Sequence, residues 1–176
     1  FSPDSRVLYA HGTSGIVFHS TESELAPFEP EHNDDLKRIG ESLLDYIRRR
    51  RSYHFLIDRF GRVYRIVAES DAANHAGHSV WADEHARYEN LNDSFLGVAF
   101  EGRGTAMTQA QLRSGAVLVE MLRHHYRIPA TNCVTHAQVS VNPSNRRVGY
   151  HVDWASGFPF ADLGLPDNYA IPLPAV

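Results

Sequence analysis

Short apolar runs alternate with two longer amphipathic segments, and this alternation most constrains how the chain can fold. A β-hairpin with Gly61 in its turn is expected from residues 52–57 and 62–67, which are rich in aromatic and β-branched side chains. Buried strands are expected at three further short apolar runs, residues 15–19, 95–100 and 133–135.

The two amphipathic segments are expected to form helices. The first begins at Asn33 or Asp34, repeats apolar residues at helical spacing and ends at the basic run 48–51, which suits the helix dipole. The second opens with a capping box at Thr108–Gln111 and ends before Pro129. Strands interleaved with helices predict an α/β fold, in which a central mixed β-sheet is flanked by α-helices.

Composition limits the organisation and the partners of the chain. A length of 176 residues predicts one domain, which we place at residues 1–165, followed by a proline-rich tail at 166–176. The formal net charge of −4 argues against a nucleic-acid partner. No apolar run approaches the ~18 residues that cross a bilayer, so no membrane span is expected. The single cysteine, Cys133, excludes an internal disulfide and leaves the compartment open. A monomer is expected.

Residues 135–154 contain three side chains that can bind a divalent metal ion: His136, His151 and Asp153. A further histidine, His19, ends the apolar run near the start of the chain. Two imidazoles and a carboxylate leave the fourth tetrahedral position open, as a catalytic zinc site requires. The alternative of ordinary loop histidines stays open at this point, because no HExxH or CxxC signature is present and the chain has 11 histidines.

Six stretches, taken in order, resemble the zinc-dependent N-acetylmuramoyl-L-alanine amidases of type 2, a family related to the peptidoglycan recognition proteins. They are G-I-V-F-H-S-T (15–21), S-Y-H-F-L-I-D-R-F-G-R-V-Y (52–64), N-H-A-G-H-S (74–79), N-D-S-F-L-G-V-A-F-E-G (92–102), T-H-A-Q-V-S (135–140) and H-V-D-W-A-S-G-F-P-F (151–160). The resemblance implies the fold of that family, a bound Zn²⁺, and hydrolysis of the amide between N-acetylmuramic acid and L-alanine.

The same resemblance implies a partner and a compartment. The substrate is expected to be peptidoglycan or a soluble muropeptide, and the location periplasmic or extracellular, at the cell wall, with the cytoplasm as the alternative. Some relatives have lost a metal ligand and only bind peptidoglycan. A non-catalytic binding module is therefore the alternative function, although this chain retains the ligand residues.

The resemblance assigns the metal ligands residue by residue. His19 and His136 match the two imidazole ligands, and Asp153 matches the third ligand, an Asp or Cys near the C-terminus. His151 stands where many members carry a lysine that stabilises the developing oxyanion, so it is expected to assist catalysis. Which of His151 and Asp153 binds the metal stays open, and Asp153 is favoured.

Three more positions are expected to contribute to catalysis or substrate binding. Tyr53 matches a tyrosine that many relatives place beside the zinc-bound water. Other members use a glutamate where this chain has Ala99, so Tyr53 is the first candidate for moving protons and Glu101 the second. His75 resembles a histidine that lines the substrate cleft of the family.

Overall fold

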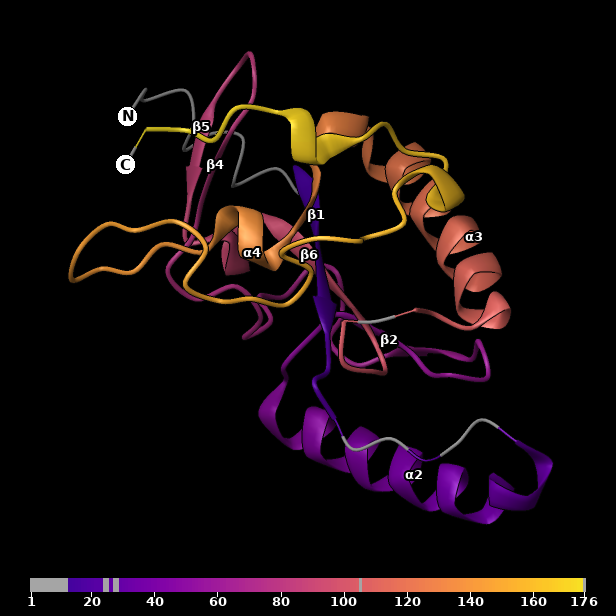
Figure 1. Ribbon diagram of the computed structural model, residues 1–176. Helices are drawn as coiled ribbons and strands as arrows, with labels where there is room; N and C mark the ends of the chain where they lie inside the picture. Colours follow the sequence, from indigo (N-terminus) through magenta and orange to yellow (C-terminus); the bar gives the residue numbers. More distant parts are fainter. Residues whose placement is uncertain (1–12, 24–25, 27–28, 105, 176) are drawn as a thin grey trace.

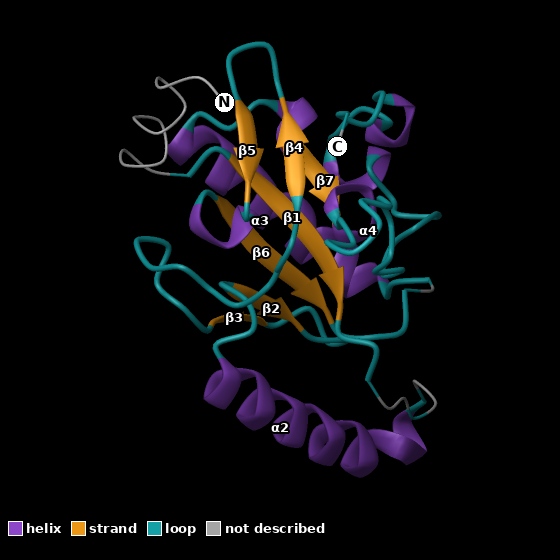
Figure 2. Ribbon diagram, turned by 90° about the vertical axis from the view of Figure 1, so that its left-hand side faces the viewer, coloured by secondary structure: helices purple, strands orange, loops and turns teal. Residues whose placement is uncertain are grey.

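The computed structural model describes residues 13–23, 26, 29–104 and 106–175, and a five-stranded sheet forms its centre (Figures 1 and 2). The strand order is β3-β2-β6-β1-β7, and a separate two-stranded sheet pairs β4 with β5. The strands are β1 (Gly15–Ser20), β2 (Phe55–Ile57), β3 (Val63–Arg65), β4 (Val80–Ala82), β5 (Arg87–Glu89), β6 (Phe95–Phe100) and β7 (Cys133–Thr135).

The central sheet is mixed. Strands β2, β6, β1 and β7 run parallel, and β3 adds an antiparallel edge. The helices are α2 (Asn33–Arg50), α3 (Gln109–Tyr126) and the short α4 (His136–Val139). Five 3-10 turns complete the described elements: Pro30–His32, Leu91–Asp93, Ala130–Asn132, Ala161–Leu163 and Asn168–Ala170. The predicted α/β fold with a central mixed sheet is confirmed.

Helix α3 covers one face of the sheet. Its residues Leu118 and Leu122 are buried in one core cluster with Phe18 of β1 and Phe100 of β6. The predicted capping box is present, since the Thr108 hydroxyl accepts a hydrogen bond from the Gln111 backbone N–H while the Gln111 side chain accepts one from the Thr108 N–H. The cap therefore fixes where this helix begins against the sheet.

The opposite face carries α2 at one side and the β4–β5 hairpin at the other. Ile47 of α2 packs with Leu56 and Ala99 of the sheet, and Val17 of β1 is buried in a cluster that includes Trp81 of β4. Successive strand residues point to opposite faces, so His19 lies on the same face as Val17. This face is where the candidate site forms.

The predicted strand 52–57 begins later than expected, and the predicted strand 62–67 ends earlier. Helix α2 stops at Arg51, whose φ of 52° is left-handed, and the chain becomes a strand only at Phe55. The N–H groups of Ile66 and Val67 both point to the carbonyl of His54, at 2.8 and 3.4 Å, so two residues oppose one. Such a bulge ends regular pairing.

Residues 135–154 and the C-terminal tail are more ordered than the sequence indicated. Helix α4 interrupts the predicted loop, because Thr135 and Gln138 form a second capping box. In the tail, the Asn168 side chain donates to the carbonyls of Ala130 and Cys133, at 2.7 and 2.8 Å. The predicted domain start at residue 1 lies outside the described residues. Within them, no helix is long and apolar enough to span a membrane.

Candidate metal centre

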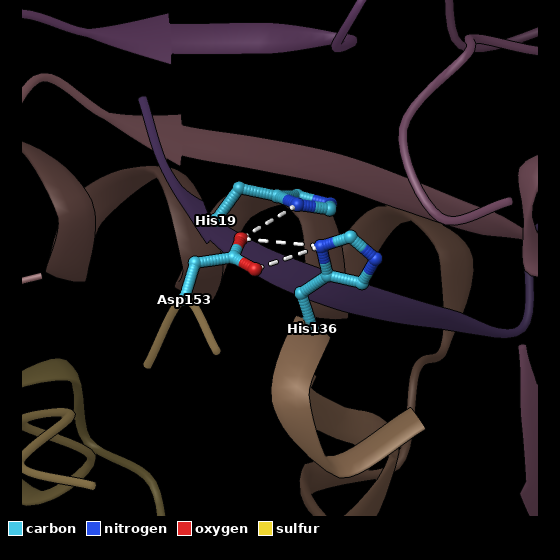
Figure 3. Close-up of side chains that lie close together, drawn as sticks. All are labelled: His19, His136 and Asp153. Carbon is cyan, nitrogen blue, oxygen red and sulfur yellow. Dashed lines mark hydrogen bonds and ion pairs between the residues drawn. The ribbon is translucent and has the colours of Figure 1, made fainter. Parts of the chain in front are cut away.

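The two predicted imidazole ligands meet because their strands are neighbours. His19 lies near the carboxyl end of β1, and His136 follows β7 directly as the first residue of α4. The strands pair in parallel with Phe18 opposite Thr135, so both histidines reach the same edge of the sheet. Asp153 approaches this edge from the C-terminal loop (Figure 3).

The ligand atoms of these three residues converge within 4.8 Å of one another. The Nδ1 atom of His19 lies 3.3 Å from Asp153 Oδ2. The Nδ1 atom of His136 lies 2.9 Å from Asp153 Oδ1 and 3.2 Å from Oδ2. Figure 3 shows both rings turning this nitrogen towards the carboxylate. The predicted ligand set is thus brought together by β1 and, more than 110 residues later, by α4 and the C-terminal loop.

Hydrogen bonds on the far side of each ring indicate where the lone pairs lie. His136 Nε2 is 3.2 Å from the carbonyl of Ala76, which can only accept, so this nitrogen carries the proton. His19 Nε2 is 3.0 Å from Nδ1 of His75. His75 Nε2 in turn faces the carbonyl of Phe95 at 2.8 Å, so Nδ1 of His75 is the acceptor and His19 Nε2 the donor. Each neutral ligand ring therefore has its lone pair at Nδ1.

The charge state of the centre suits a cation. Burial lowers the pKa of His19 to about 4, so this ring is neutral near pH 7. Asp153 is the acidic side chain of the group of three. Two nitrogen lone pairs and a carboxylate repel one another unless a cation binds among them. Imidazole nitrogen and carboxylate oxygen are the donors that zinc accepts, so the residues fit a zinc ion.

Asp153 is held in place by its neighbours along the chain. Its backbone carbonyl accepts a hydrogen bond from the N–H of Ala137 at 3.3 Å, which joins it to the helix that carries His136. The next residue, Trp154, has a left-handed φ of 60° and is buried on the α3 side against Phe158, with ring centroids 5.2 Å apart. The carboxylate can therefore point to the metal centre while the indole anchors the loop in the core.

His151 lies beside the centre and outside the group of three. Its ring stacks on His136 with centroids 4.4 Å apart and an interplanar angle of 21°. The residue is exposed, and its backbone N–H donates to Ser140 Oγ at 3.2 Å. Burial and the neighbouring His136 lower the pKa of His151. The ligand atoms of Asp153, His19 and His136 lie within 4.8 Å of one another, and His151 does not belong to this group.

Tyr53 lies beside His19. Its ring centroid is 5.1 Å from that of His19, and it follows helix α2 by three residues. Burial, and next the charge of Asp153, raise the pKa of the phenol above its ordinary value. The hydroxyl therefore keeps its proton throughout the physiological range and can act as a hydrogen-bond donor.

A family model for N-acetylmuramoyl-L-alanine amidase matches residues 10–149. The chain belongs to this amidase family. The matched span includes His19, Tyr53 and His136 and ends before Asp153. No curated protein sequence matches the chain closely enough to count as a relative.

Solved structures of amidases share the fold. The AmpD structure, a selenomethionine derivative, is 26% identical with a TM-score of 0.57, and the match covers 87% of this chain and 83% of that one. AmpDh3 from Pseudomonas aeruginosa, in complex with anhydromuramic pentapeptide, is 20% identical with a TM-score of 0.62 over 86% of this chain and 58% of that one. AmiD from E. coli, in complex with its substrate anhydro-N-acetylmuramic acid-L-Ala-D-γ-Glu-L-Lys, a muramyl tripeptide, is 23% identical with a TM-score of 0.57 over 72% of this chain and 49% of that one. The match thus spans about half the length of the AmiD chain.

The amidase fold places Glu101 away from the three ligands. One carboxylate oxygen accepts the backbone N–H of Arg59 at 3.0 Å, and the side chain lines a small pocket with Lys37 and Asp58. Burial raises the pKa of Glu101. Ala99, which stands opposite His19 in the strand register, offers no polar atom. Of the two predicted proton carriers, Tyr53 is the one that contacts the centre.

His75, which was predicted to line the substrate cleft, is buried beside His19. It is 6% exposed, and both ring nitrogens are engaged, one with His19 and one with the carbonyl of Phe95. It lies behind His19, where it can orient the ligand. The carbonyl of Ala76, which orients His136, was not predicted, since a backbone group leaves no signal in a sequence.

Proposed function

We propose that this chain is a zinc-dependent amidase that hydrolyses the bond between N-acetylmuramic acid and L-alanine. The observation that carries the proposal is the convergence of the two Nδ1 lone pairs of His19 and His136 with the Asp153 carboxylate, at the edge of an amidase-family sheet. Zinc bound by these three residues would supply an activated water and a polarised carbonyl.

Tyr53 is proposed to act on the reacting amide from the side of the site next to His19. Because burial keeps the phenol protonated, its hydroxyl can donate a hydrogen bond to the substrate carbonyl oxygen or pass a proton towards the leaving amine. Ala99 cannot do so, and the Glu101 carboxylate is held by Arg59.

His151 is proposed to act on the amide from the side of the site next to His136. Its exposed ring, stacked on His136, has at least one N–H in either protonation state. That group can donate to the carbonyl oxygen as negative charge develops there, which is the role of an oxyanion donor. The developing charge is then held between His151 and the metal centre.

The substrate is proposed to be peptidoglycan or a muropeptide derived from it. AmiD and AmpDh3 share the fold, and their structures contain anhydromuramic peptides. We further propose that the protein works as a monomer, in the periplasm or outside the cell, where the wall is accessible.

Metal analysis and product identification together test the proposal. The purified protein is expected to contain one zinc ion per chain and to release peptides with a free L-alanine amino group from peptidoglycan or soluble muropeptides. The His136→Ala variant is expected to lose nearly all zinc and activity, while His124→Ala on helix α3 should keep both. Full zinc occupancy in His136→Ala would overturn the ligand assignment. A zinc-free wild-type protein that binds peptidoglycan would support the binding module.

A further inference from the structure

We infer that the 74–77 segment, N-H-A-G, selects the nitrogen that each ligand histidine offers to the metal, and that Asn92 holds this segment in place. The inference rests on the proposed zinc site and concerns residues outside the ligand set. Two consecutive residues of one segment hydrogen-bond to the far side of both ligand rings, although His19 comes from strand β1 and His136 from helix α4.

The first contact runs through the side chain of His75. The Phe95 carbonyl, 2.8 Å from Nε2, requires the proton of His75 on that nitrogen. Nδ1 of His75 then accepts the Nε2 proton of His19 at 3.0 Å. His75 is buried, so water cannot readily replace either hydrogen-bond partner of its ring. The chain of two hydrogen bonds thus fixes the His19 lone pair at Nδ1.

The second contact uses the backbone of the next residue. The carbonyl of Ala76 lies 3.2 Å from Nε2 of His136. Ala76 is 1% exposed, so water cannot readily replace this acceptor. Both ligand rings are therefore protonated at Nε2, because the 74–77 segment supplies an acceptor to each of them. Any shift of this segment would disturb both rings together. Partners of this kind, which orient ligands through the second ring nitrogen, are typical of histidine metal sites.

Asn92 binds the backbone of the segment at the two residues that make these contacts. Its Oδ1 atom accepts the N–H of His75 at 2.9 Å and the N–H of Ala76 at 2.6 Å. A single side-chain oxygen thus binds the backbone of both residues that contact the ligand rings. Asn92 itself contacts no ligand residue in the described part of the chain.

Gly97 provides the room that His75 needs. A Cβ atom at this position of strand β6 would lie 2.6 Å from Cγ and 2.8 Å from Nδ1 of His75. Contacts this short do not occur, so any side chain at residue 97 would displace the ring that orients His19. The ring of His75 packs directly against the backbone of Gly97. This close approach supports a positioning role for His75.

The pair Asn92→Ala and Asn92→Asp tests the inference, since aspartate keeps the acceptor oxygen. Zinc affinity is measured by competition with a chelating dye, and the tautomers of His19 and His136 by ¹⁵N NMR of the metal-free protein. Asn92→Ala is expected to bind zinc about 10- to 100-fold more weakly, the usual range for lost orienting partners. Its two ligand rings should show mixed tautomers, while Asn92→Asp should recover most of the affinity and the Nε2-protonated form.

A variant that affects one ligand alone separates the loss of ligand orientation from a general loss of structure. His75→Ala removes the acceptor of His19 alone, so only the His19 tautomer should change while that of His136 stays. Wild-type zinc affinity and tautomers in folded Asn92→Ala, checked by near-UV circular dichroism, would overturn the inference even if its melting temperature fell. Failure of the wild-type protein to bind zinc would instead refute the proposed function.

Discussion

Tyr53 and His151 contact different histidines of the metal centre, and this placement gives them different roles. Tyr53 is beside His19 at the end of helix α2, whereas His151 is stacked on His136 in the C-terminal loop. Because neither belongs to the converging group of three, each can be changed without removing a ligand. Metal content and turnover can therefore be measured as separate consequences of each substitution.

Tyr53→Phe is expected to lower turnover by roughly tenfold or more while zinc content and folding persist, because it removes only the donating hydroxyl. Glu101→Gln should have the smaller effect, since the Glu101 carboxylate is directed to Arg59. Steady-state kinetics on a soluble muropeptide, with metal analysis of each variant, measure the difference. Full activity in Tyr53→Phe together with an inactive Glu101→Gln would assign the role to the carboxylate.

His151→Ala is expected to keep zinc and lose about two to three orders of magnitude in turnover, the cost of an oxyanion donor. His151→Lys should recover part of that loss, because it restores a donor where related amidases carry lysine. The readout is turnover at saturating substrate, with zinc content as the control. Loss of zinc in His151→Ala would make this residue a ligand and demote Asp153.

The convergence of the three proposed ligand residues could be predicted from the sequence, but the atoms that orient them could not. His19, His136 and Asp153 belong to recognisable stretches and converge as the resemblance implied. The Ala76 carbonyl cannot be identified in this way, because every residue has a carbonyl and only the fold decides which one meets a ligand. His75 was noticed by its motif, yet its burial behind His19 depends on the absence of a side chain at Gly97 in another strand.

At the scale of elements, the long helices and buried strands follow from local patterns, while the short elements do not. Strand β6 and helix α3 match the predicted ranges, since apolar runs and a capping box act within a few residues. Helix α4 was missed because it has only four residues, HAQV, too few to show a helical period. The bulge opposite His54 likewise depends on pairing across strands.

Thr108→Ala is expected to lower the free energy of unfolding by about 1 kcal/mol, because the Gln111 N–H loses its acceptor at the start of α3. Thr108→Ser keeps the hydroxyl and should stay close to wild type. Urea denaturation followed by circular dichroism measures both variants. Equal unfolding midpoints for Thr108→Ala and wild type would show that the cap does not stabilise this helix.

At the scale of the whole molecule, three buried histidines make stability depend on pH. His19, His54 and His75 all have pKa values lowered chiefly by burial, and neighbouring rings contact one another through the core. The unfolded chain binds protons on them near pH 6.5, whereas the folded chain resists protonation until about pH 4 at His19. The unfolded state therefore gains protons first, and stability falls as pH decreases through this window.

The metal-free protein is expected to lose stability steadily below about pH 6.5, with each of these histidines adding up to ~1.4 kcal/mol per pH unit. Urea unfolding between pH 7.5 and 4.5 measures the slope. His54→Gln should reduce the slope, while His124→Gln on the surface of α3 should leave it unchanged. Stability that does not change between pH 6.5 and 5 would contradict the neutral buried state of these rings.

The arrangement of strands β1 and β7 also determines when the metal centre can form. His19 and Asp153 are separated by 134 positions, and His136 lies between them in sequence. When β1, α2 and β6 have been synthesised, only His19 of the proposed ligands is present. His136 follows with α4, and Asp153 is made last. The proposed ligand set is therefore complete only once the C-terminal loop that carries Asp153 has been made.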